Sequence, residues 1–558
     1  MAENDNYVGL SKEEVSALKE LITTAESEED SDIETELENV SDKSDQDITT
    51  DEDSDSSDLS IGVEIPQKRS RNDVFSWKSG RFCPTVYKFE NETCGFHQPP
   101  SFLEHPKELD FFECYFTEEL AVQIATETNH YFIYLKDTQG NFPNKSRLNQ
   151  WVETDSNEIY LFLGVTMLIS RNKKLKVNDC WSTDPLLHTP IFSKVMPRDR
   201  YLLLLRLLHF CDNTKQKKGE RTFKIDLVMS FLSNRFKVLF TPFENLCIDE
   251  SLVLWKERLS FKQYIKSKRH RFGVKMFVLC NVETDYILGF IVYTGSQTKI
   301  KPSDLGISGS VVLTLLEDYL DKGHNLYIDN WHSSPELALH LYQHKTNVCG
   351  TVRTNRRHMP KLPDPKVKGD IESQHTAEMM TGKVDRTSKE EVKKPTCIVD
   401  YNANMGSVDK VDMLLSSVEC LRKTIKWYKK IFFHLVDLCM INAHAMYKVY
   451  TGNRTTLAHF QLEVIRQIVK KYAKIQKTSK KGRPSSGDNP LRLIGRHFPQ
   501  KIPPVPGGKK TCQRICFVCK HTQRGVSRRR DTSYQCAECD KALCLIPCFE
   551  VYHTKQIF

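Results

Sequence analysis

A short apolar run with an acidic residue at its centre is the feature that most constrains the fold of this chain. Residues 246–255 read Leu-Cys-Ile-Asp-Glu-Ser-Leu-Val-Leu-Trp, a pattern that predicts a short buried strand. A lone carboxylate such as Asp249 is costly to desolvate in a strand of this kind. We therefore expect Asp249 to have a cationic partner, and a metal ion is one candidate.

The next hundred residues predict an alternation of strands and helices. Two β-rich runs, at 274–282 and 286–294, flank Thr284-Asp285 and indicate a hairpin. The pattern then predicts a helix at 311–320, a strand at 325–330, a helix from about Ser334 to Lys345 with Pro335 at its first position, and a strand at 347–352.

This order of elements is typical of a ribonuclease-H-like fold, in which the first and fourth strands lie side by side and parallel. In that arrangement Asp249 and Asp329 face each other in the middle of the sheet. Two facing carboxylates can share divalent metal ions.

A third acidic motif, Asn-Met-Gly-Ser-Val-Asp-Lys-Val-Asp-Met-Leu-Leu, occupies residues 404–415 and predicts the start of a helix with Asp409 and Asp412 on one face. Together with Cys-Ile-Asp-Glu-Ser at Asp249 and Tyr-Ile-Asp-Asn-Trp at Asp329, it resembles the acidic motifs of the piggyBac transposase family, especially the piggyBac transposable element-derived proteins. The resemblance continues through 268–275 and 422–430 to the cysteine-rich end, and so covers the chain from about residue 105.

The resemblance implies a DNA transposase that cleaves and joins phosphodiesters. Asp249, Asp329 and Asp409 would hold two Mg²⁺ (or Mn²⁺) ions, and Asp412 would act in or beside the same site. Double-strand excision through hairpin ends and integration at TTAA are also implied by the resemblance alone. The expected partners are therefore double-stranded DNA, as element ends and TTAA target, and a second copy of the chain in a homodimer.

Each acid also has a simpler interpretation. Asp329 could cap the following loop, Asp409 and Asp412 could be first-turn acids favoured by the helix dipole, and Asp249 could form a buried ion pair. A rival hypothesis is a domesticated, catalytically impaired nuclear DNA- or chromatin-binding protein. It is supported by Ser407 and Met413, where the family usually has Gly and Gln, and by residues 368–375, which look short for the family's strand-rich insert.

Charge is distributed unevenly along the chain. Residues 1–60 hold 21 acidic and 3 basic residues, so this segment carries −18 and the remaining 498 residues carry +26 of the formal net charge of +8. A basic body favours polyanions as partners. Basic residues interleaved with aromatic ones predict DNA contacts at Lys268, Arg269, Arg271, Lys423, Lys426, Lys429 and Lys430.

Cysteine spacing is the most specific local signal. The chain has 18 cysteines and no visible signal peptide or membrane span, so clustered thiols favour metal binding over disulfides. Seven potential ligands follow one another in the spacing of paired Cys-x-x-Cys knuckles and predict a domain with two Zn²⁺ ions. They are Cys516, Cys519, Cys536, Cys539, Cys544, Cys548 and His553. The sequence leaves the eighth ligand open, with Cys512 and His521 as candidates. It also leaves open whether this domain binds terminal-repeat DNA or histone tails.

These observations predict a multidomain α/β and α protein. Residues 1–100 have the composition of a disordered acidic region, with serines as possible kinase sites and Lys68-Arg-Ser-Arg71 as a short nuclear localisation signal, so we expect a nuclear protein. Residues 105–243 with 414–472 are expected to form a helical dimerisation and DNA-binding domain. Residues 244–352 with 396–413 are expected to form the ribonuclease-H-like catalytic domain, which a shortened insertion at 353–395 splits. A basic linker at 473–510 is expected to lead to the zinc-binding domain at 511–558.

Overall fold

The computed structural model of the protein contains two compact units, residues 1–473 and 474–558. The structure describes residues 75, 85–89, 94–97, 102, 105–266, 268, 271–360, 378–384, 391–420, 426–473, 497–504, 512–522 and 529–555. The acidic region, the possible kinase sites, the basic cluster at 68–71 and most of the basic linker lie outside these residues.

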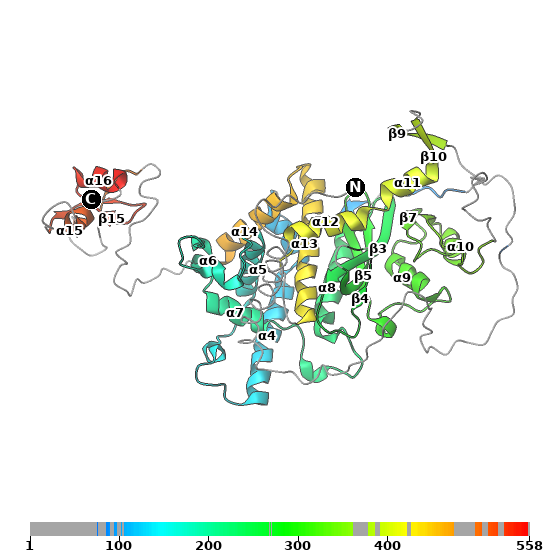
Figure 1. Cartoon of the computed structure of the whole chain (residues 1–558), viewed down its shortest axis with the longest axis horizontal. Helices are drawn as coiled ribbons and strands as arrows, with labels where there is room; N and C mark the ends of the chain where they lie inside the picture. The colour runs from blue at the N-terminus through cyan, green and yellow to red at the C-terminus, as the bar shows by residue number, and fades with distance from the viewer. Residues whose placement is uncertain are drawn as a thin grey trace, which may run out of the picture. The chain divides into compact units, whose positions relative to one another are not determined.

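A mixed sheet forms the centre of the first unit (Figure 1). Its strands are β3 (Asn245–Leu254), β4 (Gln263–Tyr264), β5 (Phe272–Asn281), β6 (Tyr286–Val292), β7 (Asn325–Ile328) and β8 (Asn347–Gly350). The strands follow the order β4-β5-β3-β7-β8, and β6 also pairs with β5. β3 is antiparallel to β5 but parallel to β7, which is in turn parallel to β8.

The pairing agrees with the order predicted from the sequence. The first and fourth predicted strands, β3 and β7, are parallel neighbours with Ile248 opposite Ile328. All seven residues of β6 are buried, because helices cover this strand. The short polar segment between β5 and β6 turns the chain at Asp285, which has a positive φ of 57°, a conformation that Asp tolerates better than most residues.

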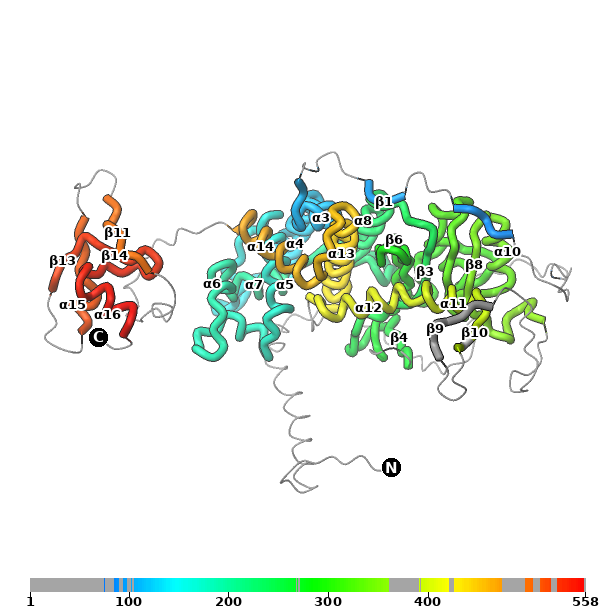
Figure 2. The backbone as a smooth tube through the Cα atoms, turned by 90° about the horizontal axis from the view of Figure 1, so that it is seen from above, coloured from blue at the N-terminus to red at the C-terminus, as the bar shows by residue number. Residues whose placement is uncertain are grey.

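Helices pack on the sheet from several segments of the chain. Contacts with β3, β5 or β6 are made by α8 (Phe223–Leu239), α9 (Gly306–Leu316), α12 (Ser407–Val418) and α13 (Trp427–Thr451), while α10 (Pro335–Gln343) packs on β8. In the tube view α12 runs beside β3 (Figure 2). Ser334 caps α10, since its side chain accepts a hydrogen bond from the backbone N–H of Leu337 (3.1 Å).

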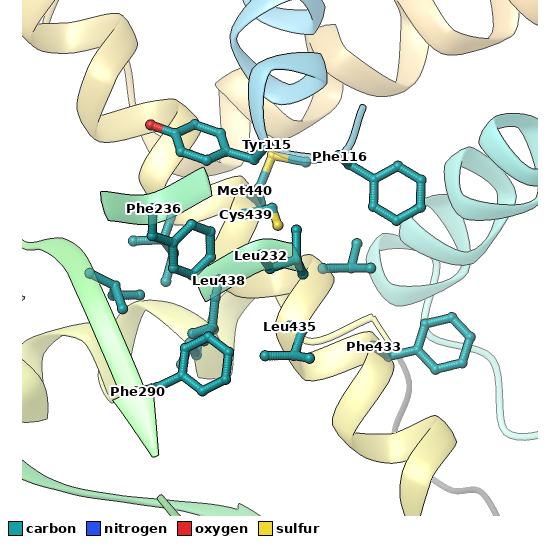
Figure 3. Close-up of a cluster of buried hydrophobic side chains, with 14 of the residues drawn as sticks. Tyr115, Phe116, Leu232, Phe236, Phe290, Phe433, Leu435, Leu438, Cys439 and Met440 are labelled. Atoms are coloured by element: carbon teal, nitrogen blue, oxygen red, sulfur yellow. The ribbon is translucent and has the colours of Figure 1, made fainter. Parts of the chain in front are cut away.

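The remaining helices form a largely α-helical region. They are α3 (Glu108–Tyr115), α4 (Glu118–Gln139), α5 (Ser156–Arg171), α6 (Pro190–Val195), α7 (Arg198–Leu207) and α14 (Leu457–Tyr472). α14 packs closely on α5 because Gly164 has no side chain, and a Cβ there would lie 2.8 Å from Ile468. Figure 3 shows side chains of α3, α8, β6 and α13 meeting in one apolar core, among them Tyr115, Phe236 and Leu438.

Two segments of the first unit differ from what their sequence predicts. The apolar periodicity from Glu108 to Asn129 predicts one helix, but the helix is broken at Thr117, whose side chain caps a new helix by accepting a hydrogen bond from the N–H of Leu120 (3.3 Å). The insertion contains an antiparallel pair, β9 (Glu378–Val384) with β10 (Glu391–Pro395), followed by α11 (Thr396–Asn404). A short β1 (Gly95–Phe96) pairs with β2 (Phe240–Thr241).

The second unit is small and built from short elements. These are β11 (Pro499–Lys501), β12 (Arg514–Ile515), α15 (Phe517–His521), β13 (Asp531–Thr532), β14 (Tyr534–Cys536), β15 (Lys541–Ala542) and α16 (Cys548–Thr554). β11 pairs with β14, so this unit begins upstream of residue 511, inside the segment that we expected to be linker. No helix within the described ranges is both long and apolar enough to cross a bilayer.

Candidate functional site

Two of the predicted acids sit on neighbouring parallel strands. Asp249 lies within β3, and Asp329 directly follows β7, whose last residue, Ile328, is paired with Ile248. Each acid is therefore the residue that directly follows one member of the Ile248–Ile328 pair. Parallel pairing of β3 with β7 brings segments that are 80 residues apart in sequence to the same level of the sheet.

The other two acids come from α12, which packs on β3. Val408 and Val411 are buried on the side of this helix that faces the protein interior. Asp412 is partly buried. Its Oδ1 accepts a hydrogen bond from the hydroxyl of Ser251 (2.5 Å), which ties the helix to the strand that carries Asp249. Asp409 stays at the surface, with a side chain 66% exposed.

Lys268 is the positive charge shared by three of these acids. Its Nζ donates to Asp409 Oδ1 at 2.8 Å. Burial opposes the charged form of Lys268, but the charges of Asp249, Asp409 and Asp412 outweigh this effect and raise the pKa of the amine. Lys268 was predicted to contact DNA, and in this structure it lies against the acidic side chains instead.

One ammonium group does not neutralise so many carboxylates. Burial raises the pKa of Asp249 well above the usual range, despite the lowering effect of Lys268. Burial likewise raises the pKa of Asp412 to about 6, and burial together with Glu250 raises the pKa of Asp329. These are hard oxygen donors in a region that is short of positive charge, which is the donor chemistry that suits Mg²⁺.

The acids do not all form one tight group. Asp249, Asp409 and Asp412 share Lys268, whereas Asp329 offers an oxygen to a different set, with Glu250 and His332, in which all ligand atoms lie within 4.8 Å of one another. The joint role of Asp249, Asp329 and Asp409 stays a prediction. Neither Glu250 nor His332 is singled out by the sequence: Glu250 directly follows Asp249, and His332 lies one residue beyond the motif of Asp329.

The basic residues predicted to contact DNA have different environments. Arg271 is exposed and Lys426 partly exposed, as a phosphate contact requires, and Arg269 and Lys423 lie outside the described residues. Lys429 is only 5% exposed and its amine donates to the carbonyl oxygens of Leu205 (2.8 Å) and Arg206 (2.7 Å).

Lys430 is also buried, with 4% exposure, and forms an ion pair with Glu419. Both of these amines therefore serve partners inside the protein in this structure. Lys429 supports the last turn of α7, where unpaired carbonyl groups need donors. Sequence alone does not separate the two cases, because Lys426, Lys429 and Lys430 all belong to one basic run.

The second unit contains two clusters of metal-ligand type. Cys516, Cys519, Cys544 and Cys548 form the first, and in each cluster the ligand atoms all lie within 4.8 Å of one another. The second cluster consists of His497, Cys536, Cys539 and His553. Four thiolates, or two thiolates with two imidazoles, are the usual donor sets of structural zinc.

The second cluster supplies the ligand that the sequence left open. The eighth ligand of the two clusters is His497, with Nδ1 3.5 Å from the sulfur of Cys536, and neither Cys512 nor His521 joins a cluster. His497 lies 39 residues before Cys536, so no local spacing reveals it. Nδ1 of His553 contacts the carbonyl oxygen of Phe549 (2.8 Å), which leaves Nε2 directed at Cys539, an arrangement typical of a metal-binding histidine.

Two protein-family models match this chain. A family model described as "Transposase IS4" matches residues 107–389 and 373–444, which together span more than half of the chain. A second model, described as "DDE_Tnp_1-like zinc finger", matches residues 496–554. That match includes His497 and every other member of the two clusters.

Similar sequences include three human proteins. PiggyBac transposable element-derived protein 3 is 24% identical over 439 residues, which cover 72% of this chain and 70% of that protein. The chimeric ERCC6-PGBD3 protein is 24% identical over the same share of this chain but only 39% of its own length. PiggyBac transposable element-derived protein 2 is 21% identical and covers 61% of each chain.

One solved structure has the same fold. It is the cryo-EM structure of a piggyBac transposase synaptic complex with hairpin DNA, with a TM-score of 0.58 and 20% sequence identity. The match covers 79% of this chain and 95% of that chain. At this identity the likeness concerns the mixed α/β fold.

Proposed function

The chain belongs to the piggyBac transposase family, and on that premise we propose that it is a DNA transposase. It would cleave element ends in a metal-dependent reaction and join them to TTAA targets. The observation that carries this proposal is that Asp249 lies in β3 and Asp329 directly follows the parallel neighbouring strand β7, with the acidic turn of α12 bonded to the same sheet. The strand order β6-β5-β3-β7-β8 supports a ribonuclease-H-like catalytic core.

In this proposal each acid has a defined task. Asp249, Asp329 and Asp409 hold Mg²⁺ or Mn²⁺, which when bound activates the attacking oxygen and stabilises the leaving oxygen. Asp412 stays bonded to Ser251 and fixes α12 against β3, so that Asp409 is presented at the sheet. Lys268 neutralises the acids when they hold no metal, and it is placed to meet a phosphate when it leaves them.

The body of the protein would bind double-stranded DNA. Its formal charge of +26, together with the exposure of Arg271 and the partial exposure of Lys426, supports contact with phosphates. The helical region would form a homodimer, the second unit would hold two Zn²⁺ ions, and the protein would act in the nucleus. Zinc would supply folding energy to a unit whose buried core consists mainly of its own cysteines.

A second candidate function is DNA or chromatin binding without cleavage. One observation favours it: Asp409 is largely exposed and paired with Lys268, while Asp329 lies with Glu250 and His332. If the acids kept this arrangement on DNA, the three predicted ligands would not act together.

A nicking assay separates the two functions. Zinc-loaded full-length protein is incubated with a duplex that carries a family-type element end, with and without Mg²⁺. We expect Asp249→Asn, Asp329→Asn and Asp409→Asn each to reduce nicking by about 100-fold or more, because the neutral amide weakens metal capture. DNA binding should stay close to that of the wild type.

Asp318→Asn is a matched control, since Asp318 is a half-exposed acid that pairs with Lys237 and belongs to none of the acidic motifs. It should nick like the wild type. Near-normal nicking by one of the three variants would remove that residue from the catalytic set. A folded, zinc-loaded wild type that binds such ends but never cuts them with Mg²⁺ or Mn²⁺ would favour the second function.

A further inference from the structure

A compact set of metal-ligand side chains lies beside the end of β7. Glu250 belongs to β3, Asp329 follows β7, and His332 lies three residues further along the chain. One ligand atom from each residue lies within 4.8 Å of the other two. The set shares Asp329 with the acids described above but contains neither Asp249 nor Asp409.

His332 is the most informative member of this set. Its side chain is completely buried, and within the described structure neither Nδ1 nor Nε2 has a hydrogen-bond partner. Buried polar groups are nearly always paired, so an imidazole with two unpaired nitrogens indicates a missing partner. Trp331 and Phe277 pack edge-on against the ring, with centroids 4.8 Å and 5.5 Å away, and restrict its orientation.

The two carboxylates are held in place, and Asp329 keeps one oxygen available. Asp329 Oδ1 accepts hydrogen bonds from the backbone N–H groups of Trp331 (3.0 Å) and His332 (3.2 Å), which leaves Oδ2 for another partner. Glu250 Oε1 accepts a hydrogen bond from Lys275 (2.9 Å), and the same carboxylate interacts with the side chain of Asp249. Supporting bonds of this kind orient the ligands of metal sites.

We propose that Glu250, Asp329 and His332 form a binding site for a divalent first-row transition metal. Two carboxylates with one imidazole suit Mn²⁺ or Zn²⁺ better than Mg²⁺, which favours oxygen donors alone. The site shares Asp329 with the proposed Mg²⁺ ligands, and Glu250 interacts with the side chain of Asp249. It differs from them in using His332 and Glu250 in place of Asp249 and Asp409, and it does not require the protein to cut DNA. Lys275 limits its affinity, because the ammonium group competes with the metal for the charge of Glu250.

Pulsed electron paramagnetic resonance of Mn²⁺ tests the nitrogen ligand directly. Full-length protein that carries only the two Zn²⁺ equivalents of its second unit is titrated with Mn²⁺, and the electron spin echo envelope is recorded. We expect modulation by a directly bound ¹⁴N nucleus. It should disappear in His332→Phe, whose ring retains the packing on Trp331, and persist in His324→Phe, a matched change of a buried histidine just before β7.

Affinity measurements provide the second test. Glu250→Gln should weaken Mn²⁺ binding at the ¹⁴N-coupled site by about 10-fold or more, whereas Lys275→Met should strengthen it. Asp249→Asn should keep the ¹⁴N modulation even though it loses nicking, which distinguishes this site from the proposed catalytic one. Failure of Mn²⁺ to bind, absence of ¹⁴N modulation in the wild type, or its survival in His332→Phe would overturn the proposal.

Discussion

The buried amine of Lys429 gives a prediction whose size follows from its surroundings. Burial lowers the pKa of this lysine from 10.5 to about 7. The folded protein therefore binds fewer protons than the unfolded chain between these two values, and the wild type gains stability as pH rises through this window. At 1.36 kcal/mol per pKa unit, the charged amine costs about 5 kcal/mol at pH 6 but only about 2 kcal/mol at pH 9.

Lys429→Met removes the amine and keeps the length of the side chain. It also leaves the carbonyl groups of Leu205 and Arg206 without this donor, a loss that does not depend on pH. The difference in free energy of unfolding between variant and wild type should therefore move by about 3 kcal/mol in favour of the wild type from pH 6 to pH 9.

Urea unfolding followed by tryptophan fluorescence measures this difference. All six tryptophans precede residue 428, so the signal reports the first unit alone. Lys448→Met is the matched control, because it removes a lysine from the last turn of the same helix at a partly exposed position, and its charge is not among those that lower the pKa of Lys429. A Lys429→Met difference that stays constant between pH 6 and pH 9 would refute the reasoning that this amine is buried.

Two further predictions concern DNA and zinc. Arg271→Ala combined with Lys426→Ala should lower the slope of log K against log salt for duplex DNA by roughly 2, whereas Lys429→Met should leave it unchanged; an unchanged slope in the double variant would remove both residues from the interface. By native mass spectrometry the second unit should bind two Zn²⁺ ions, and His497→Ala should retain one while His521→Ala retains both. Equal loss in the two histidine variants would contradict the assignment of His497.

Elements with a strong local signal were predicted well from the sequence. β3, β5 and β7 begin and end within two residues of the predicted runs, and the parallel pairing of β3 with β7 is as expected. These segments are short, apolar and bounded by polar turns, so their pattern is dominated by burial. The break at Thr117 was missed because a capping threonine interrupts a helix without interrupting its apolar periodicity.

The site was less predictable because it depends on contacts between distant segments. Motif spacing identified the predicted acids, but not the bond from Ser251 to Asp412, which joins residues 161 positions apart. No local pattern distinguishes His332, because its burial and its unpaired ring nitrogens depend on packing between distant segments. The burial of Lys429 depends in the same way on packing against α7, more than 200 residues earlier in the chain.

The pairing of the first helices with the last ones has a consequence for synthesis of the protein. The backbone N–H of Leu109 in α3 donates to the side chain of Gln467 in α14, across 358 residues of sequence. At ribosomal rates of about 5–20 residues per second, α3 waits roughly 20–70 s for that partner to be made. Throughout this interval the apolar face formed by Phe111, Phe112 and Tyr115, all fully buried in the finished protein, has no completed core to enter. A nascent chain of this topology should therefore depend on chaperones, and truncation before α13 should yield an aggregating fragment instead of a smaller folded domain.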